Sequence, residues 1–471
     1  MRDKWTKIVY ICIGSIILLL LVALYFQLTK NTLNKEIAKV TEEPQQHFLE
    51  PISPDFDKYP DSGDQGDTIS DERGKDKRIK NLNSNIEASI EVTDRLARMN
   101  SGENVMFSPT SLNFALGLLQ EGADKKAKNA IDKYLNTNNY KEYAKSYLES
   151  VDEINQRTVD KLEKVRDWEN LSDEDIYNSK TIHIANSIWI NKNSHINDSY
   201  IENLENNYRA TADKMDVNNP EEAAKKINNW TNENTFGLIK EMVKPGEITP
   251  DTQAVLANSV YFCASWSDKW WAEKYENGDD ALTDFTIKNG NETITEKVCY
   301  MDNDGNTYYE NKYATAFSCH YNVYGLEFIG ILPKKEGDFE LSDLDINGLL
   351  STGTTKFDEL NIKMPKLNYE TDIEVKEILM DMGYKDLFSD SYSKIGDGVV
   401  LDNIFQKTKL ELDEEKTCAA AVTMETTTLG ATFAPIFPKI YNVYLTRPFA
   451  FLIYDFQNDE VLFIGKVVTT K

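Results

Sequence analysis

Apolar residues recur at helical spacing and at strand spacing from about residue 85 to the C-terminus. Residues 85–98 place their apolar side chains near one helical face. Residues 182–190 alternate, with isoleucines on one side, which is typical of a strand. Residues 325–333 form another apolar run, and residues 449–467 hold two such runs around a polar turn, as expected for a hairpin buried on both faces. The pattern predicts an α+β fold, with helices early and antiparallel sheet late.

A strand predicted at residues 404–413 carries a polar side chain on its inward face. Its charged residues, Lys407 among them, alternate with the inward-facing residues and are expected to face water. Gln406 has the inward parity. Because a buried amide without a hydrogen-bond partner costs about 1–3 kcal/mol, we expect Gln406 to have a partner in the core.

Two helices have clear start signals. Ser108 precedes Pro109 and an apolar run, the pattern of an N-cap followed by proline in the first turn. Asn219 and Pro220 repeat this pattern, and Glu222 adds a capping-box carboxylate. The sequence therefore predicts helices that begin next to Ser108 and Asn219.

The N-terminus contains a long apolar segment. Residues 8–28, from Ile8 to Leu28, carry no charge and are long enough to span a bilayer. The basic residues of segment 1–7 predict a cytoplasmic N-terminus, with the rest of the chain outside the cell. A cleaved signal peptide, followed by secretion, is the alternative, but such a peptide has a shorter apolar region and a small-residue cleavage site. The sequence favours an uncleaved single-pass anchor that contacts the membrane through Ile8–Leu28.

Residues 29–82 separate this segment from the globular part. They are polar, contain four prolines and end in mixed charges, which predicts a disordered acidic linker. A flexible chain of about 50 residues averages roughly 40 Å from end to end. Residues 83–471 follow as one globular domain without another linker.

Charge and composition exclude several classes of function. The net charge of −26 argues against nucleic-acid binding, which needs clustered Lys and Arg. Five cysteines show no CxxC spacing, so neither a disulfide framework nor a zinc site is predicted. Four histidines are dispersed, and no nucleophile, base or metal constellation stands out. We therefore predict no catalytic residue, metal or cofactor, and we expect a monomer.

One long stretch near the C-terminus fits neither a helix nor a core strand. Thr417 to Pro438 reads TCAAAVTMETTTLGATFAPIFP, and Glu425 is its one charged residue. Small, neutral side chains are what a strand needs in order to enter a packed sheet, because large ones clash and a buried unpaired charge is costly.

Five segments resemble signatures of the serpin family. They are NVMFSPTSLNFALGLLQEGA (104–123), INNWTNENTFGLIKEMV (227–243), LANSVYFCASW (256–266), residues 363–388 and residues 447–467. Their order and spacing are similar to those of the family, and the resemblance covers about residues 85–471. It implies helices packed on three mainly antiparallel sheets, with Thr417–Pro438 as an exposed reactive-centre loop.

The resemblance also implies a function. A serpin loop is attacked by a protease, forms an acyl-enzyme and then inserts into the main sheet as a new strand. The chain is therefore expected to be a suicide-substrate inhibitor of serine or cysteine endopeptidases, not an enzyme. The alternative is a non-inhibitory serpin-fold binding protein on the cell surface.

Roles carry over to individual residues. The implied sheet-opening residues are Ser108, Ser111, Asn258, Trp266 and Gln406, where Gln406 replaces a histidine of many serpins. The implied hinge residues are Glu414, Lys416, Thr417, Cys418, Ala419, Ala420, Ala421, Val422 and Thr423. Lys416 replaces a glycine of inhibitory relatives, which could stiffen the first step of insertion, whereas the alanines and threonines favour inhibition.

The reactive bond falls at Gly430–Ala431 by the family's distance from Glu414. The loop is longer than in some relatives, so the range extends to Leu429, Thr432, Phe433, Ala434 and Pro435. The small side chains indicate a target protease with a shallow primary pocket, elastase-like or subtilisin-like. A trypsin-like target is disfavoured because Thr417–Pro438 contains no Lys or Arg.

Overall fold

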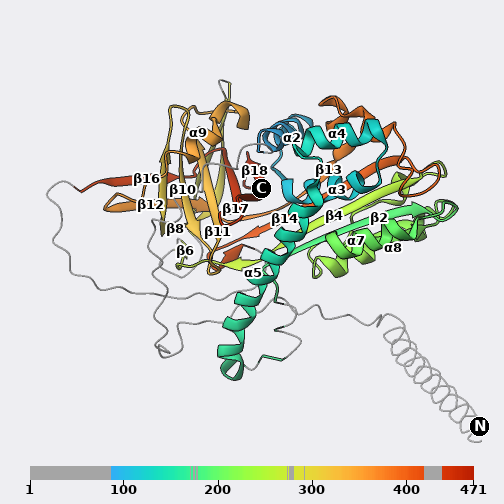
Figure 1. Ribbon diagram of the computed structural model, residues 1–471. Coiled ribbons are helices and arrows are strands. Elements are labelled where there is room, and N and C mark those ends of the chain that lie inside the picture. The colour runs from blue at the N-terminus through green and yellow to red at the C-terminus, as the bar shows by residue number, and fades with distance from the viewer. Residues whose placement is uncertain are drawn as a thin grey trace, which may run out of the picture. The chain divides into compact units, whose positions relative to one another are not determined.

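The computed structural model describes residues 86–169, 171–172, 176, 179–272, 274, 281–290, 292–417 and 438–471. Within these ranges the chain forms three β-sheets with helices packed on them, an α+β fold (Figure 1). The predicted segments 1–7, 8–28 and 29–82 lie outside the described residues. No helix among the described residues has the length and apolar composition needed to cross a bilayer.

The largest sheet, called the main sheet below, runs in the order β3-β2-β4-β14-β15-β5, and β13 also pairs with β14. Its strands are β2 (Ile182–Asn191), β3 (Thr211–Met215), β4 (Ala254–Phe262), β5 (Ala264–Ser265), β13 (Leu367–Glu374), β14 (Leu401–Leu412) and β15 (Lys416–Thr417). β4 and β14 are parallel neighbours, whereas β15 is antiparallel to both of its neighbours. The main sheet therefore contains a two-residue strand between the end of the long strand β14 and the equally short β5.

The other two sheets are mainly antiparallel. One has the order β1 (Val105–Phe107), β18 (Glu460–Val467), β17 (Phe449–Asp455), β11 (Leu326–Pro333), β10 (Ala314–His320) and β9 (Thr307–Glu310). The other has the order β16 (Ile440–Tyr444), β12 (Glu359–Pro365), β8 (Glu292–Asp304) and β6 (Trp271–Ala272), and β7 (Leu282–Asn289) also pairs with β8. The antiparallel pair of β17 and β18 confirms the hairpin predicted at residues 449–467.

Helices pack on both faces of the main sheet and also on the sheet that contains β1, β9, β10 and β18. They are α2 (Ile86–Met99), α3 (Pro109–Gly122), α4 (Lys125–Leu135), α5 (Tyr140–Glu169), α7 (Asp198–Tyr208), α8 (Pro220–Asn234), α9 (Ile346–Leu350) and α10 (Val375–Asp381). The two predicted starts are confirmed, because the Ser108 side chain accepts the Ser111 N–H at α3 and the Asn219 side chain accepts the Glu222 N–H at α8. α3 and α8 lie on opposite sides of β2 and β4 (Figure 1).

Alternation along the strands explains why the main sheet is buried on both faces. Ile188 and Leu256 join the large core that contains α3. Trp189 and Val255, one residue away in each strand, join a second cluster with Ile227 of α8. Successive strand residues point to opposite faces, so two separate apolar clusters hold one sheet.

The prediction that Lys407 faces water is wrong. Lys407 is 8% exposed, and its ammonium lies 2.7 Å from the Glu370 carboxylate and 3.2 Å from that of Asp372. Both carboxylates belong to β13, which pairs with β14 and places Asp372 opposite Lys407. A charged strand residue is buried here because the neighbouring strand supplies its counter-ions.

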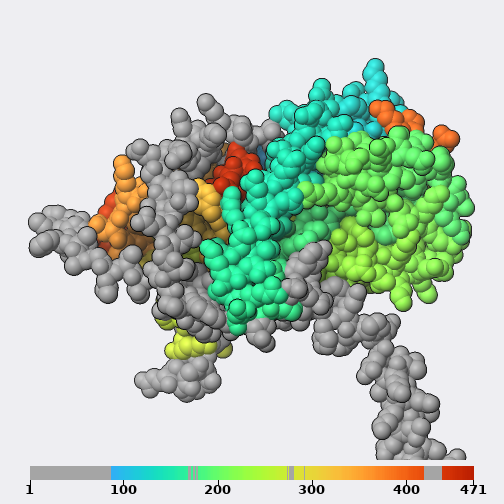
Figure 2. All heavy atoms as spheres, turned by 60° about the horizontal axis from the view of Figure 1, so that its bottom comes forward, coloured from blue at the N-terminus to red at the C-terminus, as the bar shows by residue number. Residues whose placement is uncertain are grey.

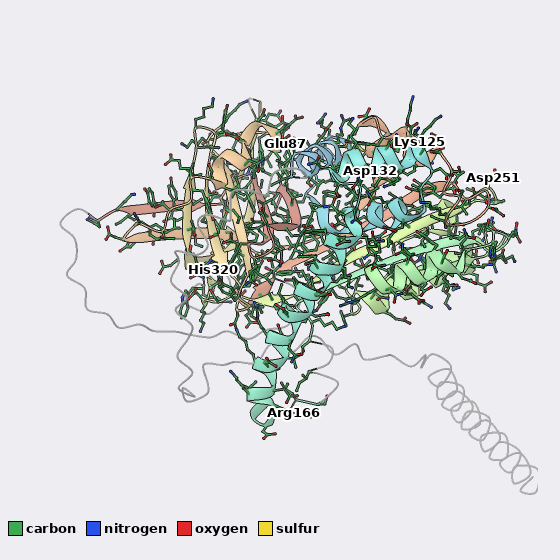
Figure 3. All side chains as sticks on the ribbon, viewed as in Figure 1. Glu87, Lys125, Asp132, Arg166, Asp251 and His320 are labelled. Carbon is green, nitrogen blue, oxygen red and sulfur yellow. The ribbon has the colours of Figure 1, made fainter. Side chains whose placement is uncertain are left out.

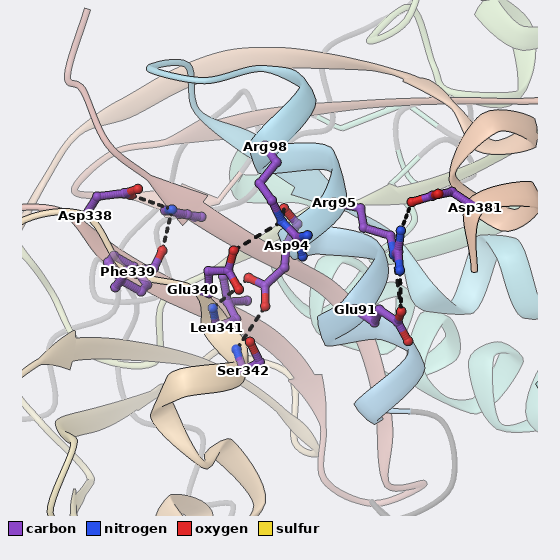
Figure 4. A network of polar contacts seen from close by, with 11 residues as sticks. Glu91, Asp94, Arg95, Arg98, Asp338, Phe339, Glu340, Leu341, Ser342 and Asp381 are labelled. Atoms are coloured by element: carbon purple, nitrogen blue, oxygen red, sulfur yellow. Dashed lines mark hydrogen bonds and ion pairs between the residues drawn. The ribbon is translucent and has the colours of Figure 1, made fainter. Parts of the chain in front are cut away.

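Helix α2 is attached to the body by charged and capping contacts (Figure 4). Asp94 accepts the backbone N–H groups of Leu341 and Ser342 at 2.6 and 3.0 Å. Arg98 lies 3.1 Å from the Glu340 carboxylate, and Arg95 forms an ion pair with Asp381 of α10. A carboxylate that caps a short helical turn in this way satisfies N–H groups that have no partner within the turn.

Helix α5 is 30 residues long, and its C-terminal part extends beyond the sheets (Figures 1 and 2). Arg166, near its end, lies away from the body of the molecule (Figure 3). Leu162 and Val165 form a separate apolar cluster with Leu171 and Ile176. The distal part of α5 therefore has its own small core.

Candidate functional site

The site lies where β4 and β14 separate. Their parallel pairing runs from Leu401 opposite Ala254 to Gln406 opposite Asn258, and no pair joins β4 to β14 beyond this point in the described part of the chain. β15 takes the place of the missing pairs, since it pairs with the end of β14 on one side and with β5 on the other. The main sheet is thus already open at one end.

β15 consists of the first two predicted hinge residues that follow Glu415. Thr417 is opposite Leu412 of β14 and Ala264 of β5, and Lys416 is opposite Ser265. Both β15 residues are buried, at 3% and 2% exposed for Lys416 and Thr417. The hinge therefore starts as a strand within the sheet and not as part of a solvent-exposed loop.

Aromatic residues form the wall of this opening. Trp266 stacks on Tyr321 with ring centroids 4.7 Å apart, and its indole N–H donates to the Asp413 carbonyl at 2.9 Å. The hydroxyls of Tyr321 and Thr417 share a hydrogen bond of 2.8 Å. Stacked aromatic pairs of this kind contribute about 0.5–1.5 kcal/mol beyond their buried area. The wall thus holds both ends of the turn that leads into β15.

The turn from β14 to β15 is built by acidic residues. The Asp413 carboxylate accepts the N–H groups of Glu415 and Lys416 at 2.9 and 3.1 Å. Glu414 pairs with Lys366 at 2.7 Å. Burial, followed by the neighbouring Asp413 and Glu414, raises the pKa of Glu415. Lys416 does not have a positive φ angle, so its position does not require the conformational freedom of glycine.

Gln406 connects the last β4–β14 pair to helix α3. Its side-chain carbonyl accepts the Ser108 N–H at 3.2 Å, and its side-chain N–H group donates to the Ser108 carbonyl at 3.0 Å. Gln406 is 3% exposed, and the expectation of a buried partner is confirmed. The amide can make both bonds because it carries a donor and an acceptor side by side.

The other predicted sheet-opening residues do not all meet. Asn258 donates to the side chain of Asn186 at 2.6 Å and makes no side-chain bond to Ser108 or Ser111 among the described residues. The Ser111 hydroxyl is buried without a partner in this part of the structure. The side chain of Gln406 therefore bonds Ser108 and that of Asn258 bonds Asn186, while Gln406 and Asn258 are neighbours across β14 and β4.

The remaining predicted residues lie outside the described ranges. They are the hinge residues Cys418, Ala419, Ala420, Ala421, Val422 and Thr423, and the reactive-bond candidates Leu429, Gly430, Ala431, Thr432, Phe433, Ala434 and Pro435. The assignments of these residues stay predictions.

Three residues at the site were not predicted from sequence. Tyr321, which follows β10, contacts the hinge, and Asn186 of β2 contacts Asn258 at the seam; no local pattern distinguishes either from a core residue. Cys263 lies between β4 and β5 and is disulfide-bonded, whereas Cys299 and Cys319 are thiols. The scattered cysteines predicted no disulfide framework, so this bond is a correction.

The described part of the chain has no metal-binding arrangement. No group of three or more His, Cys, Asp or Glu side chains there could hold a metal ion. The site instead combines an open sheet edge, a short strand that occupies it, and an aromatic wall. Such an arrangement can accept more strand from the segment that follows Thr417.

The chain belongs to the serpin family. The family profile described as Serpin (serine protease inhibitor) matches residues 83–470. The family consists of protease inhibitors and not of enzymes.

Individual relatives agree with this membership. An uncharacterised serpin-like protein of Thermococcus kodakarensis is 31% identical over 299 residues, which are 61% of this chain and 66% of that protein. Serpin-Z10 of Arabidopsis thaliana is 27% identical over 423 residues, 82% of this chain and 98% of the relative. The native state of the thermophilic serpin tengpin matches in structure with a TM-score of 0.59 and 23% identity, over 81% of this chain and 94% of tengpin. The last likeness shows the fold.

Proposed function

We propose that the chain is a suicide-substrate inhibitor of serine or cysteine endopeptidases. In this proposal a protease cleaves the loop after Thr417, becomes acylated, and is trapped when the released part of the loop enters the main sheet between β4 and β14. The observation that carries the proposal is the position of β15 between β14 and β5. The start of the loop already occupies the place where an inserted strand would run.

The strand register supports insertion along this path. Ala264 and Leu412 both face Thr417, and the last β4–β14 pair, Asn258 with Gln406, lies six residues further along each strand. A strand continued by six residues from Thr417 would bring Thr423 opposite both members of that pair. Residues 418–423 could therefore insert without breaking any β4–β14 pair, and only later residues would have to separate the two strands.

The energy of insertion is large enough to drive the rearrangement. About a dozen loop residues gaining ladder hydrogen bonds at roughly 0.5–1.5 kcal/mol each give on the order of 10 kcal/mol. The alanines and threonines that follow Thr417 are small enough for a close-packed sheet. A protease carried along with its acylated loop would lose catalytic alignment, and a misplacement of about 1 Å can cost roughly a hundredfold in rate.

The loop composition supports a particular class of target. The residues directly around the proposed Gly430–Ala431 bond, Leu429 to Thr432, are small or aliphatic, and Thr417–Pro438 contains no Lys or Arg. We propose an elastase-like or subtilisin-like protease with a shallow primary pocket as the partner in a covalent complex.

A second candidate function is that of a non-inhibitory binding protein. The observation in its favour is α5, whose 30 residues extend beyond the sheets and carry the separate cluster of Leu162, Val165, Leu171 and Ile176. A projecting helix with its own small core offers a surface to which a partner can bind.

We also propose that the protein is held at the cell surface. The apolar run of residues 8–28 and the basic residues before it support a single-pass anchor with the serpin domain outside, and secretion after cleavage is the alternative.

The inhibitory proposal is tested with the full chain and two proteases, elastase and subtilisin. We expect a covalent protease complex that survives denaturing electrophoresis. Thr417→Arg should abolish the complex and yield cleaved chain instead, because the side chain at 417 is 2% exposed and burying an unpaired charge costs several kcal/mol. Thr417→Ser, which keeps the hydroxyl, is the matched control and should still form the complex.

Two results would contradict the inhibitory proposal. One is clean cleavage of the unmodified chain by both proteases without any complex. The other is complex formation by Thr417→Arg at the level of the control, which would mean that entry of Thr417 into the sheet is not required.

A further inference from the structure

A cavity lies away from the hinge, where helices α2, α3, α4 and α5 meet the start of β18 (Figure 1). Its volume is about 360 Å³, and it is lined by residues of all four helices and by residues 458–461. None of the described residues that line it is Lys, Arg or His. Carboxylates therefore set the electrostatic character of the cavity.

The buried carboxylate of Glu460 is the polar centre of the cavity. Glu460 is 8% exposed. One of its oxygens accepts the Thr110 hydroxyl at 2.7 Å, and the other accepts the Tyr143 hydroxyl. No basic side chain pairs with Glu460 in the described part of the chain. A carboxylate has about four acceptor sites, so the two neutral hydroxyls leave capacity for further donors.

Glu460 is the group in this cavity whose charge changes near neutral pH. Burial raises the pKa of its carboxyl to about 7, and the hydrogen bonds from Tyr143 and Thr110 oppose this rise only in part. The other titratable side chains that act on it come from α5 and the β17–β18 hairpin; they are Tyr140, Tyr143, Tyr147, Asp455 and Asp459. Burial raises the pKa of the three tyrosines far above neutrality and also raises that of Asp455. The helices α2, α3 and α4 contribute no titratable residue to the lining, so a positive charge inside would favour the ionised form of Glu460.

Two tyrosines of α5 form an aromatic wall beside this carboxylate. The rings of Tyr140 and Tyr143 have centroids 5.4 Å apart, and both residues line the cavity. Tyr140 is 5% exposed, and its hydroxyl has no hydrogen-bond partner among the described residues. After burial, the Glu460 carboxylate is the next cause of the raised pKa of Tyr140, so the two groups lie close together. Buried polar groups are normally hydrogen-bonded, and this hydroxyl is therefore a second group that a ligand would satisfy.

We propose that this cavity binds a small organic ammonium ion. The ammonium group donates to the Glu460 carboxylate and to the Tyr140 hydroxyl oxygen, and the carbon skeleton lies against the rings of Tyr140 and Tyr143. Charge-assisted hydrogen bonds to a carboxylate and cation–π contacts to tyrosine both favour a cation here. An engineered cavity of about 150 Å³ holds benzene, so the larger cavity of this chain has room for an amine with a ring or a chain of several carbons.

Binding has a defined proton balance. A protonated Glu460 releases its proton to solvent when the ammonium ion binds, and the ligand keeps its own charge. A carboxyl with a pKa of about 7 is roughly 1% ionised at pH 5 and roughly 90% ionised at pH 8. The affinity for an ammonium ion should therefore rise steeply with pH over this range. The proposal does not depend on the inhibitory function proposed above.

Isothermal titration calorimetry of the full chain with benzylammonium tests the proposal. Benzyl alcohol and benzoate are the matched neutral and anionic probes. At pH 8 we expect benzylammonium to bind at least tenfold more tightly than benzyl alcohol, and we expect benzoate not to bind. Lowering the pH to 5 should weaken the binding of benzylammonium by a factor of ten or more, and titrations at pH 6 in two buffers should show release of nearly one proton.

Three variants assign this binding to the cavity. Glu460→Gln keeps the size of the side chain and should lose at least tenfold in affinity together with the pH dependence. Tyr140→Phe removes a hydroxyl that bonds no described residue, so it should fold normally and bind benzylammonium several-fold more weakly. Glu296→Gln is the control, because Glu296 is 6% exposed and does not line this cavity; its affinity should be unchanged.

Several results would overturn the proposal. Benzylammonium that does not bind at millimolar concentration, or that binds no better than benzyl alcohol at pH 8, would show that the cavity does not select a cation. Unchanged affinity in Glu460→Gln would place the binding elsewhere. If Glu460→Gln does not fold, unchanged affinity in Tyr140→Phe has the same meaning. None of these outcomes bears on whether the chain traps a protease.

Discussion

Replacing Gln406 with leucine tests the connection between the seam of the main sheet and helix α3. Leucine is close in size but removes both hydrogen bonds to the Ser108 backbone. The Ser108 carbonyl keeps a bond of 3.3 Å from the Leu112 N–H, whereas the Ser108 N–H is left buried without this partner. An orphaned buried donor costs about 1–3 kcal/mol and the second lost bond about 0.5–1.5 kcal/mol, so we expect a loss of roughly 3 kcal/mol in the free energy of unfolding.

Urea unfolding followed by tryptophan fluorescence measures this loss. With an m value of about 3 kcal/mol/M, the midpoint should fall by roughly 1 M. The control is Thr408→Val, two residues along the same strand, which removes one hydrogen bond from the Thr408 hydroxyl to the Met106 carbonyl at 2.9 Å and keeps the shape. We expect this control to lower the stability by only about 1 kcal/mol.

Equal midpoints for the Gln406 and Thr408 variants would refute the reasoning, because the Gln406 amide would then contribute no more than a single hydroxyl. An unchanged midpoint for Gln406→Leu would show that the Ser108 N–H finds another partner. A change in m instead of the midpoint would indicate an altered unfolded or native state and not a lost pair of bonds.

The remaining predictions concern pH, α5 and a surface ion pair. Burial raises the pKa of the Glu460 carboxyl to about 7. The folded state therefore keeps a proton that the unfolded state loses near pH 4.5. The free energy of unfolding consequently falls as the pH rises from about 4.5 to 7. Relative to Glu460→Gln, the unfolding free energy should be about 3 kcal/mol lower at pH 8 than at pH 4, and parallel pH profiles would contradict this. Lys161→Met removes a 2.7 Å hydrogen bond from the Lys161 ammonium to the Asn322 side chain. Backbone amide hydrogen exchange near Asn322 should therefore become faster. An unchanged exchange rate would show that this hydrogen bond does not hold the turn. The Arg209–Asp152 pair is half-exposed, so a double-mutant cycle should give a coupling of at most about 1 kcal/mol, and a larger value would mean that the pair is less solvated than its exposure indicates.

Sequence patterns predicted the parts of the fold that depend on neighbours in the chain. The cap residues Ser108 and Asn219 mark helix starts because the groups that they bond lie within the next few residues. The parity of residues 404–413 placed Gln406 inside because strand side chains alternate. The same parity failed for Lys407, since burial there depends on the carboxylates of β13, which the strand's own sequence does not reveal.

The candidate site depends on residues that only the fold brings together. Tyr321 follows β10 and reaches Thr417 over a sequence separation of 96 residues. β15 has two residues and is too short to show any periodicity. The pairing of Asn258 with Asn186, in place of the expected serines, follows from the register of β4 with β2. No sequence pattern near any of these residues predicts its contacts. The family resemblance indicated only the region, namely the main sheet and the hinge.

The hinge and the distal part of α5 contact the same short turn. The Tyr321 hydroxyl shares a hydrogen bond with Thr417. The next residue, Asn322, accepts a hydrogen bond from Lys161 of α5 and donates its backbone N–H to the Ser265 carbonyl of β5 at 2.8 Å. Arg157 of α5 donates to the Tyr324 carbonyl at 3.0 Å in that turn. A movement of α5 would therefore reach both the strand that β15 pairs with and the aromatic residue that holds Thr417. The turn at residues 321–324 is bonded to α5 on one side and to β5 and Thr417 on the other. The two-residue strand β15 can therefore stay at the open end of the main sheet, because its neighbours are bonded to α5 as well as to the sheet.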